Sequence, residues 1–201
     1  MAERTAVRGR TRRALLLAGI EVLSDDASAT LGKVAERAGV ARSTLHRHFP
    51  DRRSLTTAIS AFVMTNYEEA FSAARTEEDT GLEAFRRVCL ELMERLEILA
   101  WWMGMGLTAA TQEDETATAE IAELDEGDDE RLTDLVTRGH EDGSIDPQLG
   151  PSWVEGLLWA TLYSARHLAQ SGAPATMPAH DVRAQALRSL LKAVAADPAT
   201  V

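Results

Sequence analysis

Apolar residues in the first 75 positions recur every three or four residues, which is the spacing of helices with one buried face. The pattern predicts a first helix over about Arg10–Leu23, a second after Thr30, a short third that ends at Phe49, and a fourth from Asp51 to about Arg75. The apolar positions are Leu16, Ile20 and Leu23; Leu31, Val34, Ala35 and Ala38; Ala41, Leu45 and Phe49; and Leu55, Ile59, Phe62 and Phe71.

The rest of the chain continues the helical spacing. The expected segments are a fifth helix through Leu82–Leu99, a short irregular helix at Ala100–Thr108, a helix through Leu132, Leu135 and Val136 that ends near Gly143, an apolar helix over Pro151–Ser171, a loop at Gly172–Pro178 and a last helix over Val182–Val194. Ala, Leu, Glu and Arg are abundant, prolines are few, and these residues favour helix. The sequence therefore predicts an all-α protein of about nine helices and no strand.

Charge divides the chain into a basic head and an acidic body. Residues 1–55 hold 11 Lys/Arg and 6 Asp/Glu, a net charge of +5, whereas residues 56–201 hold 10 and 26, a net charge of −16. The acidic stretch Glu113–Glu130 is expected to be a solvated face or a mobile loop. This division predicts that only the first quarter of the chain faces nucleic acid.

The single cysteine, Cys89, excludes an internal disulfide and a multi-cysteine metal site. Arg12 and Arg13 before the apolar run Ala14–Ile20 imitate a short signal sequence, but Glu21 interrupts the run. No stretch is long enough to span a bilayer. We therefore expect a cytoplasmic protein without membrane contact.

The second and third predicted helices form a compact pair. Thr30 can cap the second helix with its hydroxyl, and Gly39 can end it in the left-handed conformation. Helices this short gain stability only by packing on one another and on the first helix. Such a pair is a helix-turn-helix.

The third helix is expected to present a polar outer face. Ala41, Leu45 and Phe49 point inward at four-residue intervals. Ser43, His46 and Arg47 then face outward, with Arg42 and Thr44 on the flanks. Small, polar and cationic residues are typical of a helix that enters a major groove.

Residues 30–49 read TLGKVAERAGVARSTLHRHF, which resembles the DNA-binding signature of the tetracycline-repressor (TetR) family. The likeness rests on the capping Thr30, Ala35, the Gly39-Val40 pair, the Thr44-Leu45 pair and Phe49, and continues into Arg52 and Leu55. It implies a helix-turn-helix DNA-binding domain at 1–55 and a helical effector-binding and dimerisation domain at 56–201. It also implies a transcriptional repressor that binds a palindromic operator as a homodimer.

The resemblance assigns roles to individual residues. It implies that Arg42, Ser43 and Arg47 approach base edges or nearby phosphates. The residues implied to hold the phosphate backbone are Thr30, Thr44, His48 and Arg52. Two departures stand out: Ala41 replaces a small hydroxyl residue that caps the recognition helix, and His46 and His48 stand where the family places tyrosines.

The two histidines have two readings. In the first they replace tyrosine as flat hydrogen-bonding groups near phosphate. In the second, nearby phosphate promotes their protonation, because imidazole titrates near pH ~6.5. The second reading predicts that operator affinity strengthens from pH 8 to pH 6.

A homodimer is expected because one helix-turn-helix offers little interface, whereas two related by a two-fold axis read a palindrome. The helix at Pro151–Ser171 is apolar on nearly every side, so that one face needs a partner. The expected interface residues are Trp153, Leu157, Leu187, Leu190 and Val194. The face of the 151–171 helix that forms the interface stays open, as does burial of the whole helix within one chain.

Aromatic and methionine residues outside the head are candidates for an effector pocket. Such stripes are more often ordinary core, but within a TetR-like body they can line a mostly apolar cavity. The candidates are Phe62, Tyr67, Cys89, Met93, Trp101, Trp102, Met105, Trp159 and Tyr163. The expected effector is a small, mostly apolar or aromatic molecule that releases the protein from DNA.

Two other functional classes, an enzyme and a protein-interaction adaptor, make different demands on the sequence. An enzyme is disfavoured because the sequence has no glycine-rich phosphate loop, nucleophile elbow or two-histidine metal spacing. No cofactor is expected. A helical protein-interaction adaptor without operator binding remains the alternative to a regulator, and it predicts no salt-dependent DNA binding.

Overall fold

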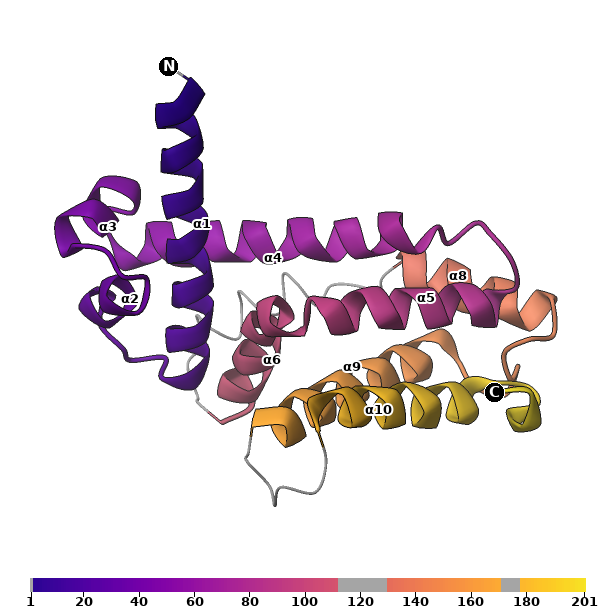
Figure 1. The fold of residues 1–201 in the computed structure, drawn as a ribbon. Helices are drawn as coiled ribbons and strands as arrows, with labels where there is room; N and C mark the ends of the chain where they lie inside the picture. Colours follow the sequence, from indigo (N-terminus) through magenta and orange to yellow (C-terminus); the bar gives the residue numbers. More distant parts are fainter. Residues whose placement is uncertain (1, 112–129, 171–177) are drawn as a thin grey trace. The chain divides into compact units, whose positions relative to one another are not determined.

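The computed structural model describes residues 2–111, 130–170 and 178–201, and side chains are described from residue 6 to residue 104 and from residue 130 onward within these ranges, except at 179 and 200. These ranges contain nine α-helices, one short 3-10 helix and no strand, which confirms the all-α prediction (Figure 1). The helices are α1 (Ala2–Asp25), α2 (Leu31–Arg37), α3 (Arg42–His48), α4 (Arg52–Ala74), α5 (Gly81–Glu94), α6 (Leu96–Thr111), α8 (Glu130–Glu141), α9 (Pro151–Gln170) and α10 (Ala179–Val194), followed by η1 (Pro198–Thr200). Most of the acidic stretch (113–129) and most of the 172–178 loop lie outside the described residues.

Two helix predictions were wrong. α1 begins at Ala2 instead of Arg10, so the basic N-terminal residues are helical. The fifth helix does not continue to Leu99: it ends at Glu94, and a regular helix, α6, starts at Leu96 and replaces the short irregular one expected at Ala100–Thr108. The break falls at Arg95, whose φ of −103° and ψ of 11° leave the helical region.

Contacts divide the chain into two compact units. The first, here the N-terminal unit, comprises Met1–Tyr67 and Glu97–Ala117; the second, the C-terminal unit, comprises Glu68–Leu96 and Thr118–Val201. α4 contributes to both units. The functional division expected at residue 55 stays a prediction.

The N-terminal unit packs α1, α2, α3 and the first part of α4 around one core. Leu16, Ile20, Leu45 and Ile59 are almost fully buried. Glu21 of α1 pairs with Arg37 of α2 through two contacts of 2.7 Å, which hold the second helix against the first. The head is thus a tightly connected support for α3.

The C-terminal unit brings α5 and α8 together at two glycines. A Cβ built on Gly81 would lie 2.3 Å from the Gly139 Cα and 2.4 Å from its nitrogen, so the two helix backbones touch. The first amides of α5 are capped from across this contact: Gly81 N–H donates to Asp142 Oδ2 at 2.7 Å and Leu82 N–H to Ser144 Oγ at 3.0 Å. The position of α5 on α8 is therefore fixed by both shape and hydrogen bonds.

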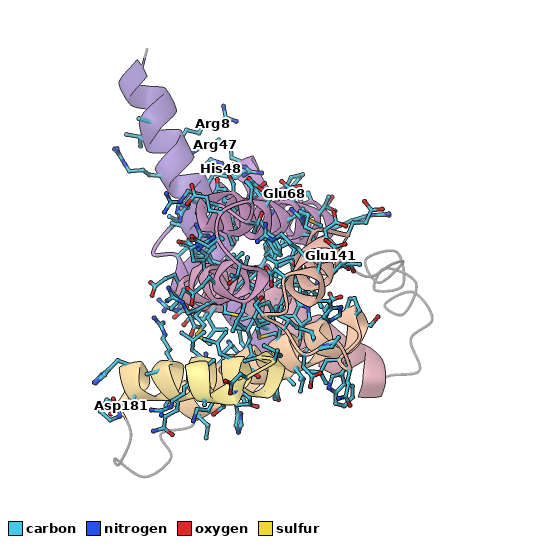
Figure 2. The ribbon with its side chains drawn as sticks, turned by 90° about the vertical axis from the view of Figure 1, so that its right-hand side faces the viewer. Arg8, Arg47, His48, Glu68, Glu141 and Asp181 are labelled. Atoms are coloured by element: carbon cyan, nitrogen blue, oxygen red, sulfur yellow. The ribbon has the colours of Figure 1, made fainter. Side chains whose placement is uncertain are left out.

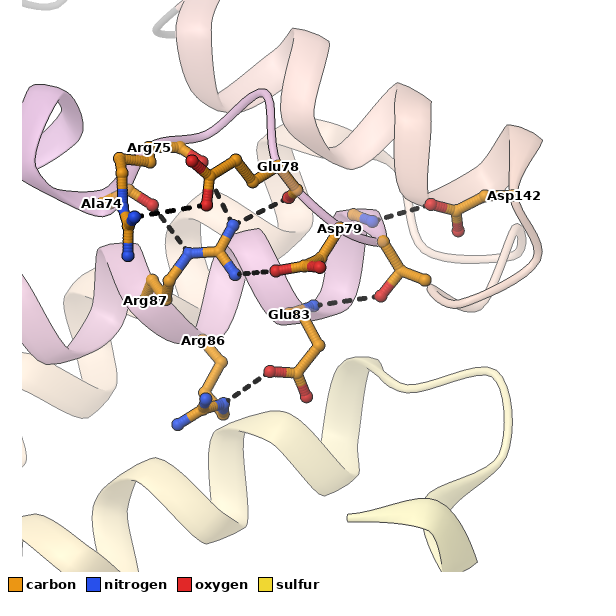
Figure 3. Close-up of polar contacts among 10 residues, drawn as sticks. Ala74, Arg75, Glu78, Asp79, Glu83, Arg86, Arg87 and Asp142 are labelled. Atoms are coloured by element: carbon orange, nitrogen blue, oxygen red, sulfur yellow. Dashed lines mark hydrogen bonds and ion pairs between the residues drawn. The ribbon is translucent and has the colours of Figure 1, made fainter.

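Arg87 of α5 organises the connection from α4 (Figure 3). Its guanidinium donates to the carbonyl oxygens of Ala74 at 2.7 Å, Arg75 at 3.1 Å and Glu78 at 2.7 Å, and it pairs with the Asp79 carboxylate at 2.8 Å. Arg75 and Asp79 both have positive φ, at 47° and 60°. The Arg87 side chain thus satisfies carbonyl oxygens at the end of α4 and in the loop that follows, where the backbone is strained.

α9 and α10 pack side by side in the C-terminal unit (Figure 1). Val154, Leu158 and Leu162 of α9 are fully buried, and α10 contributes Val182, Leu191 and Val194. No helix within the described ranges is both long and apolar enough to cross a membrane.

Candidate nucleic-acid interface

α2 has the caps that the sequence predicts. The Thr30 hydroxyl accepts the Lys33 amide at 3.4 Å. At the other end, Gly39 adopts a φ of +67°, its amide donates to the Glu36 carbonyl, and the Val40 amide donates to the Ala35 carbonyl. These two bonds form a Schellman motif, in which glycine avoids the Cβ penalty of the left-handed region. The motif sets the turn between α2 and α3.

α3 presents the outer face that its sequence predicts. Leu45 and Phe49 are 1 % and 3 % exposed, whereas Ser43, His46 and Arg47 are exposed. Ala41 does not point inward as expected: it precedes the helix as its N-cap, is exposed, and makes no side-chain cap hydrogen bond. The short helix is therefore held by two apolar side chains near its C-terminal end.

Cations from α1 and α3 surround His48 (Figure 2). The pKa of His48 is lowered by partial burial, and then by the positive charges of Arg8, Arg47 and Arg12. Arg12 also lies over the Phe49 ring, with its guanidinium carbon 5.5 Å from the ring centroid. The basic surface of the head therefore continues from α3 onto α1.

The sequence prediction left out Arg8 and Arg12, which the structure places near His48 and Phe49. They are four positions apart and so share one face of α1. The signal was present as five arginines within the first 13 residues, but α1 was expected to begin only at Arg10.

Replacing both Arg8 and Arg12 by glutamine is expected to weaken DNA binding and lower its salt dependence by about 2 in log–log slope, because each phosphate contact releases about one counterion. Fluorescence anisotropy with duplex DNA at several salt concentrations measures this slope. Arg10→Gln is the matched control, because Arg10 is two residues from either partner and lies on another side of α1. A slope that the double variant leaves unchanged would contradict the assignment.

Arg52 braces the head from α4. Its guanidinium donates to the Ala29 carbonyl at 2.7 Å and to the Ala27 carbonyl, and so ties α4 to the segment before α2. Asp51 caps α4 by accepting the Ser54 amide at 2.7 Å, and this bond is the largest cause of the lowered pKa of Asp51. The phosphate contact expected of Arg52 stays a prediction beside this structural role.

Known proteins resemble this chain both in sequence and in structure. The sequence model of the family described as "Bacterial regulatory proteins, tetR family" matches residues 15–59. The HTH-type transcriptional repressor LfrR of Mycolicibacterium smegmatis is 29 % identical over 196 residues, covering 98 % of this chain and 96 % of LfrR. The crystal structure of the TetR-like transcriptional regulator LfrR from Mycobacterium smegmatis superposes with a TM-score of 0.67, at 28 % identity over 92 % of this chain and 96 % of that one. Residues 15–59 thus resemble the DNA-binding region of the tetR family, and the chain as a whole is similar to LfrR.

Two further structures extend the comparison. LfrR from Mycobacterium smegmatis in complex with proflavine gives a TM-score of 0.64 at 29 % identity, over 92 % of this chain and 96 % of that one. The ketosteroid transcriptional regulator KstR2 of Mycobacterium tuberculosis, at 17 % identity and a TM-score of 0.63 over 92 % of this chain and 94 % of that one, shows the same fold. The family and LfrR are described as transcriptional regulators, and neither description is that of an enzyme.

The structure brings four of the expected pocket residues into the N-terminal unit. Tyr67 and Trp102 meet edge to face, with ring centroids 5.4 Å apart, and the Trp101 indole donates to Ser60 Oγ at 3.2 Å. Phe62 lies under the Arg13 guanidinium, 5.3 Å from it. A polar neighbour that the helical spacing did not indicate is Asn66 of α4, which is 7 % exposed and donates to the Phe62 carbonyl at 2.7 Å.

The other expected pocket residues lie in the C-terminal unit or outside the described side chains. Cys89 and Met93 are buried, and burial raises the pKa of the Cys89 thiol. Trp159 is half-buried and donates to Glu155 at 3.4 Å. Tyr163 is exposed and stacks on His167, so it lies on the outside of α9. Met105 lies outside the described side chains.

The expected interface residues separate into two groups. Trp153 is 63 % exposed, and Leu157 and Leu187 are half-buried. Leu190 and Val194 are only 2 % and 0 % exposed within the single chain, so their assignment to an interface was wrong. Leu190 and Val194, which are four residues apart, lie on the inner face of α10, and this face packs on its own chain.

Proposed function

We propose that this protein is a homodimeric transcriptional repressor of the TetR family that binds a palindromic operator and is released by a small, mostly apolar or aromatic effector. The observation that carries the proposal is the exposure of Ser43, His46 and Arg47 on a short helix that Leu45 and Phe49 hold to the head. This is the arrangement of a recognition helix in a major groove. LfrR is described as a transcriptional repressor, which supports repression.

Selection from a randomised duplex library tests the operator proposal. We expect the protein to enrich a palindrome whose half-sites are about one helical turn apart, or a multiple of that distance. Its affinity for the enriched duplex should fall steeply with salt. Recovery of no enriched sequence at low salt would contradict the proposal and favour the adaptor alternative.

The dimer proposal rests on an exposed stripe along α9. Trp153, Gly156, Ala160, Tyr163 and His167 are all exposed and follow at alternating intervals of three and four residues. This spacing places them on one helix face, as in helices that pack lengthwise on a partner. Small residues at the centre allow close approach of a second helix. We propose this stripe, with Leu157 and Leu187 beside it, as the two-fold interface.

The effector proposal rests on the aromatic residues of the N-terminal unit. Tyr67 and Trp102 are in ring contact, Trp101 is buried beside Ser60, and Asn66 places a buried amide on the same helix as Tyr67. An apolar lining with few polar groups is typical of small-molecule sites. The structure of LfrR with proflavine supports a ligand of this kind.

Tryptophan fluorescence tests the effector proposal with proflavine as the first probe. We expect saturable quenching together with a lower affinity for the enriched duplex, because a ligand that prefers the unbound state shifts the population away from DNA. The variant Trp102→Leu should lose the quenching signal. Saturable binding that leaves DNA affinity unchanged would contradict the coupling.

Operator affinity is expected to rise as the pH falls from 8 to 6. In the free protein, burial and the positive charges of Arg8, Arg47 and Arg12 keep the pKa of His48 low, and a phosphate placed among them raises it. Binding then takes up a proton, so affinity grows as the pH falls through the pKa of the complex and levels off below that of the free protein. Binding titrations across this range measure the effect.

The variant His48→Tyr should remove this pH dependence. His46→Tyr is the matched control, because His46 lies on the exposed face, with its Nδ1 3.2 Å from the Pro50 carbonyl oxygen. A slope that persists in His48→Tyr would rule out His48 as the titrating group.

A further inference from the structure

The second residue of α2, Gly32, lies directly beneath the guanidinium of Arg42, the first residue of α3. A Cβ built on Gly32 would lie 2.8 Å from Arg42 Nη2 and 2.9 Å from both Cζ and Nε. These distances are shorter than real Cβ contacts, so any larger residue at this position displaces the guanidinium. The planar end of Arg42 therefore rests on the backbone of α2.

The backbone itself does not require glycine here. Gly32 is inside α2 and, unlike Gly39, has no left-handed φ. Glycine is among the least favourable residues for a helix interior. In a helix of only seven residues, such as α2, one glycine is a large fraction of the helix. Glycine is thus required here by space, because the Arg42 guanidinium occupies the position in which any other residue would place its Cβ.

We infer that Gly32 seats the Arg42 guanidinium on α2, so that Arg42 contacts the DNA backbone and leaves base readout to Ser43 and Arg47. In a helix-turn-helix the first helix of the pair crosses the phosphate backbone, while the second enters the groove. Arg42 starts α3, but its guanidinium lies over Gly32 in the first turn of α2, the helix that crosses the phosphate backbone in such a motif. The inference rests on the proposed operator binding and assigns one of the two roles that the sequence left open for Arg42.

If Gly32 holds the Arg42 guanidinium in this way, replacing Gly32 should change thermal stability and DNA affinity in opposite directions. Gly32→Ala should raise the thermal stability of the head, because alanine favours helix and the obstructing atoms belong to the flexible end of a side chain. The same change should lower DNA affinity by displacing Arg42. Gly9→Ala is the matched control: Gly9 lies inside α1, and a Cβ there would meet nothing within 4 Å.

The experiment uses the duplex enriched from the random library, single-base variants of it, and an unrelated duplex of equal length. Arg42→Ala should weaken binding to all of them about equally, by about fivefold at 0.15 M salt, and lower the salt slope by about 1. Gly32→Ala should produce a part of this loss in the wild-type background and none in the Arg42→Ala background. Arg47→Ala should instead reduce the preference for the enriched duplex.

The outcomes distinguish failure of the proposed operator binding from failure of the inference about Gly32 and Arg42. If the wild-type protein enriches no duplex, the proposed function fails and the inference with it. If it does, loss of discrimination at one base pair in Arg42→Ala overturns the backbone role. If Gly32→Ala still lowers DNA affinity in the Arg42→Ala background, Gly32 does not act by positioning Arg42, and the inference fails.

Discussion

Replacing Gly81 by alanine is expected to destabilise the C-terminal unit by about 3 kcal/mol, the upper part of the range for overpacking a core. The added Cβ would lie 2.3 Å from the Gly139 Cα and 3.1 Å from the Leu135 carbonyl oxygen. Backbone atoms cannot rotate away as a side chain can, so α5 and α8 must separate. Separation would also weaken the bond from Gly81 N–H to Asp142. Urea unfolding followed by circular dichroism measures the change.

Gly9→Ala serves as the control for Gly81→Ala, because it adds the same methyl group to a helix with open space around it. It should leave the unfolding midpoint unchanged or raise it. An unfolding midpoint of Gly81→Ala equal to that of the parent would show that the close approach of α5 and α8 is not maintained in solution.

Replacing Ala160 by glutamate is expected to dissociate the proposed dimer and to lower operator affinity by about 100-fold, the smaller end of the gain from joining two binding modules. Ala160 is exposed at the centre of the α9 stripe, between Gly156 and Tyr163. In a two-fold interface the new carboxylates would be buried near one another without cationic partners. Analytical ultracentrifugation gives the mass, and anisotropy gives the affinity.

Ala169→Glu is the matched control for Ala160→Glu, since it is the same substitution at an exposed position on the opposite side of α9. It should remain a dimer with unchanged DNA affinity. A dimeric Ala160→Glu protein would move the interface to another surface.

The fold could be predicted where local chemistry marks it. Thr30, Gly39 and Asp51 each delimit a helix through a specific cap or backbone conformation, and all three were found as expected. The break at Arg95 carries no such mark, because neither glycine nor proline is near it and the leucine spacing continues through it. There the arginine side chain itself accommodates the break, by donating to the Glu91 carbonyl at 2.9 Å.

The site could be predicted only as far as one helix determines it. The outer face of α3 follows from Leu45 and Phe49, so Ser43, His46 and Arg47 were found from spacing alone. The proximity of Arg8 and Arg12 to His48, and of Arg42 to Gly32, depends on how separate helices cross. Burial of Leu190 and Val194 likewise depends on which face of α10 meets its own chain.

The missing cap at Ala41 leaves the opening turn of α3 without the side-chain hydrogen bond that Thr30 gives to α2. Without a side-chain oxygen there, the amides of Ser43 and Thr44 lack the side-chain acceptor that a serine or aspartate would provide. The turn is closed by backbone bonds, in which the Ala41 carbonyl accepts the Thr44 amide at 2.9 Å and the Leu45 amide at 3.2 Å. We therefore expect this turn to open more readily in the free protein than a turn with a side-chain cap would, and to become more ordered on a duplex.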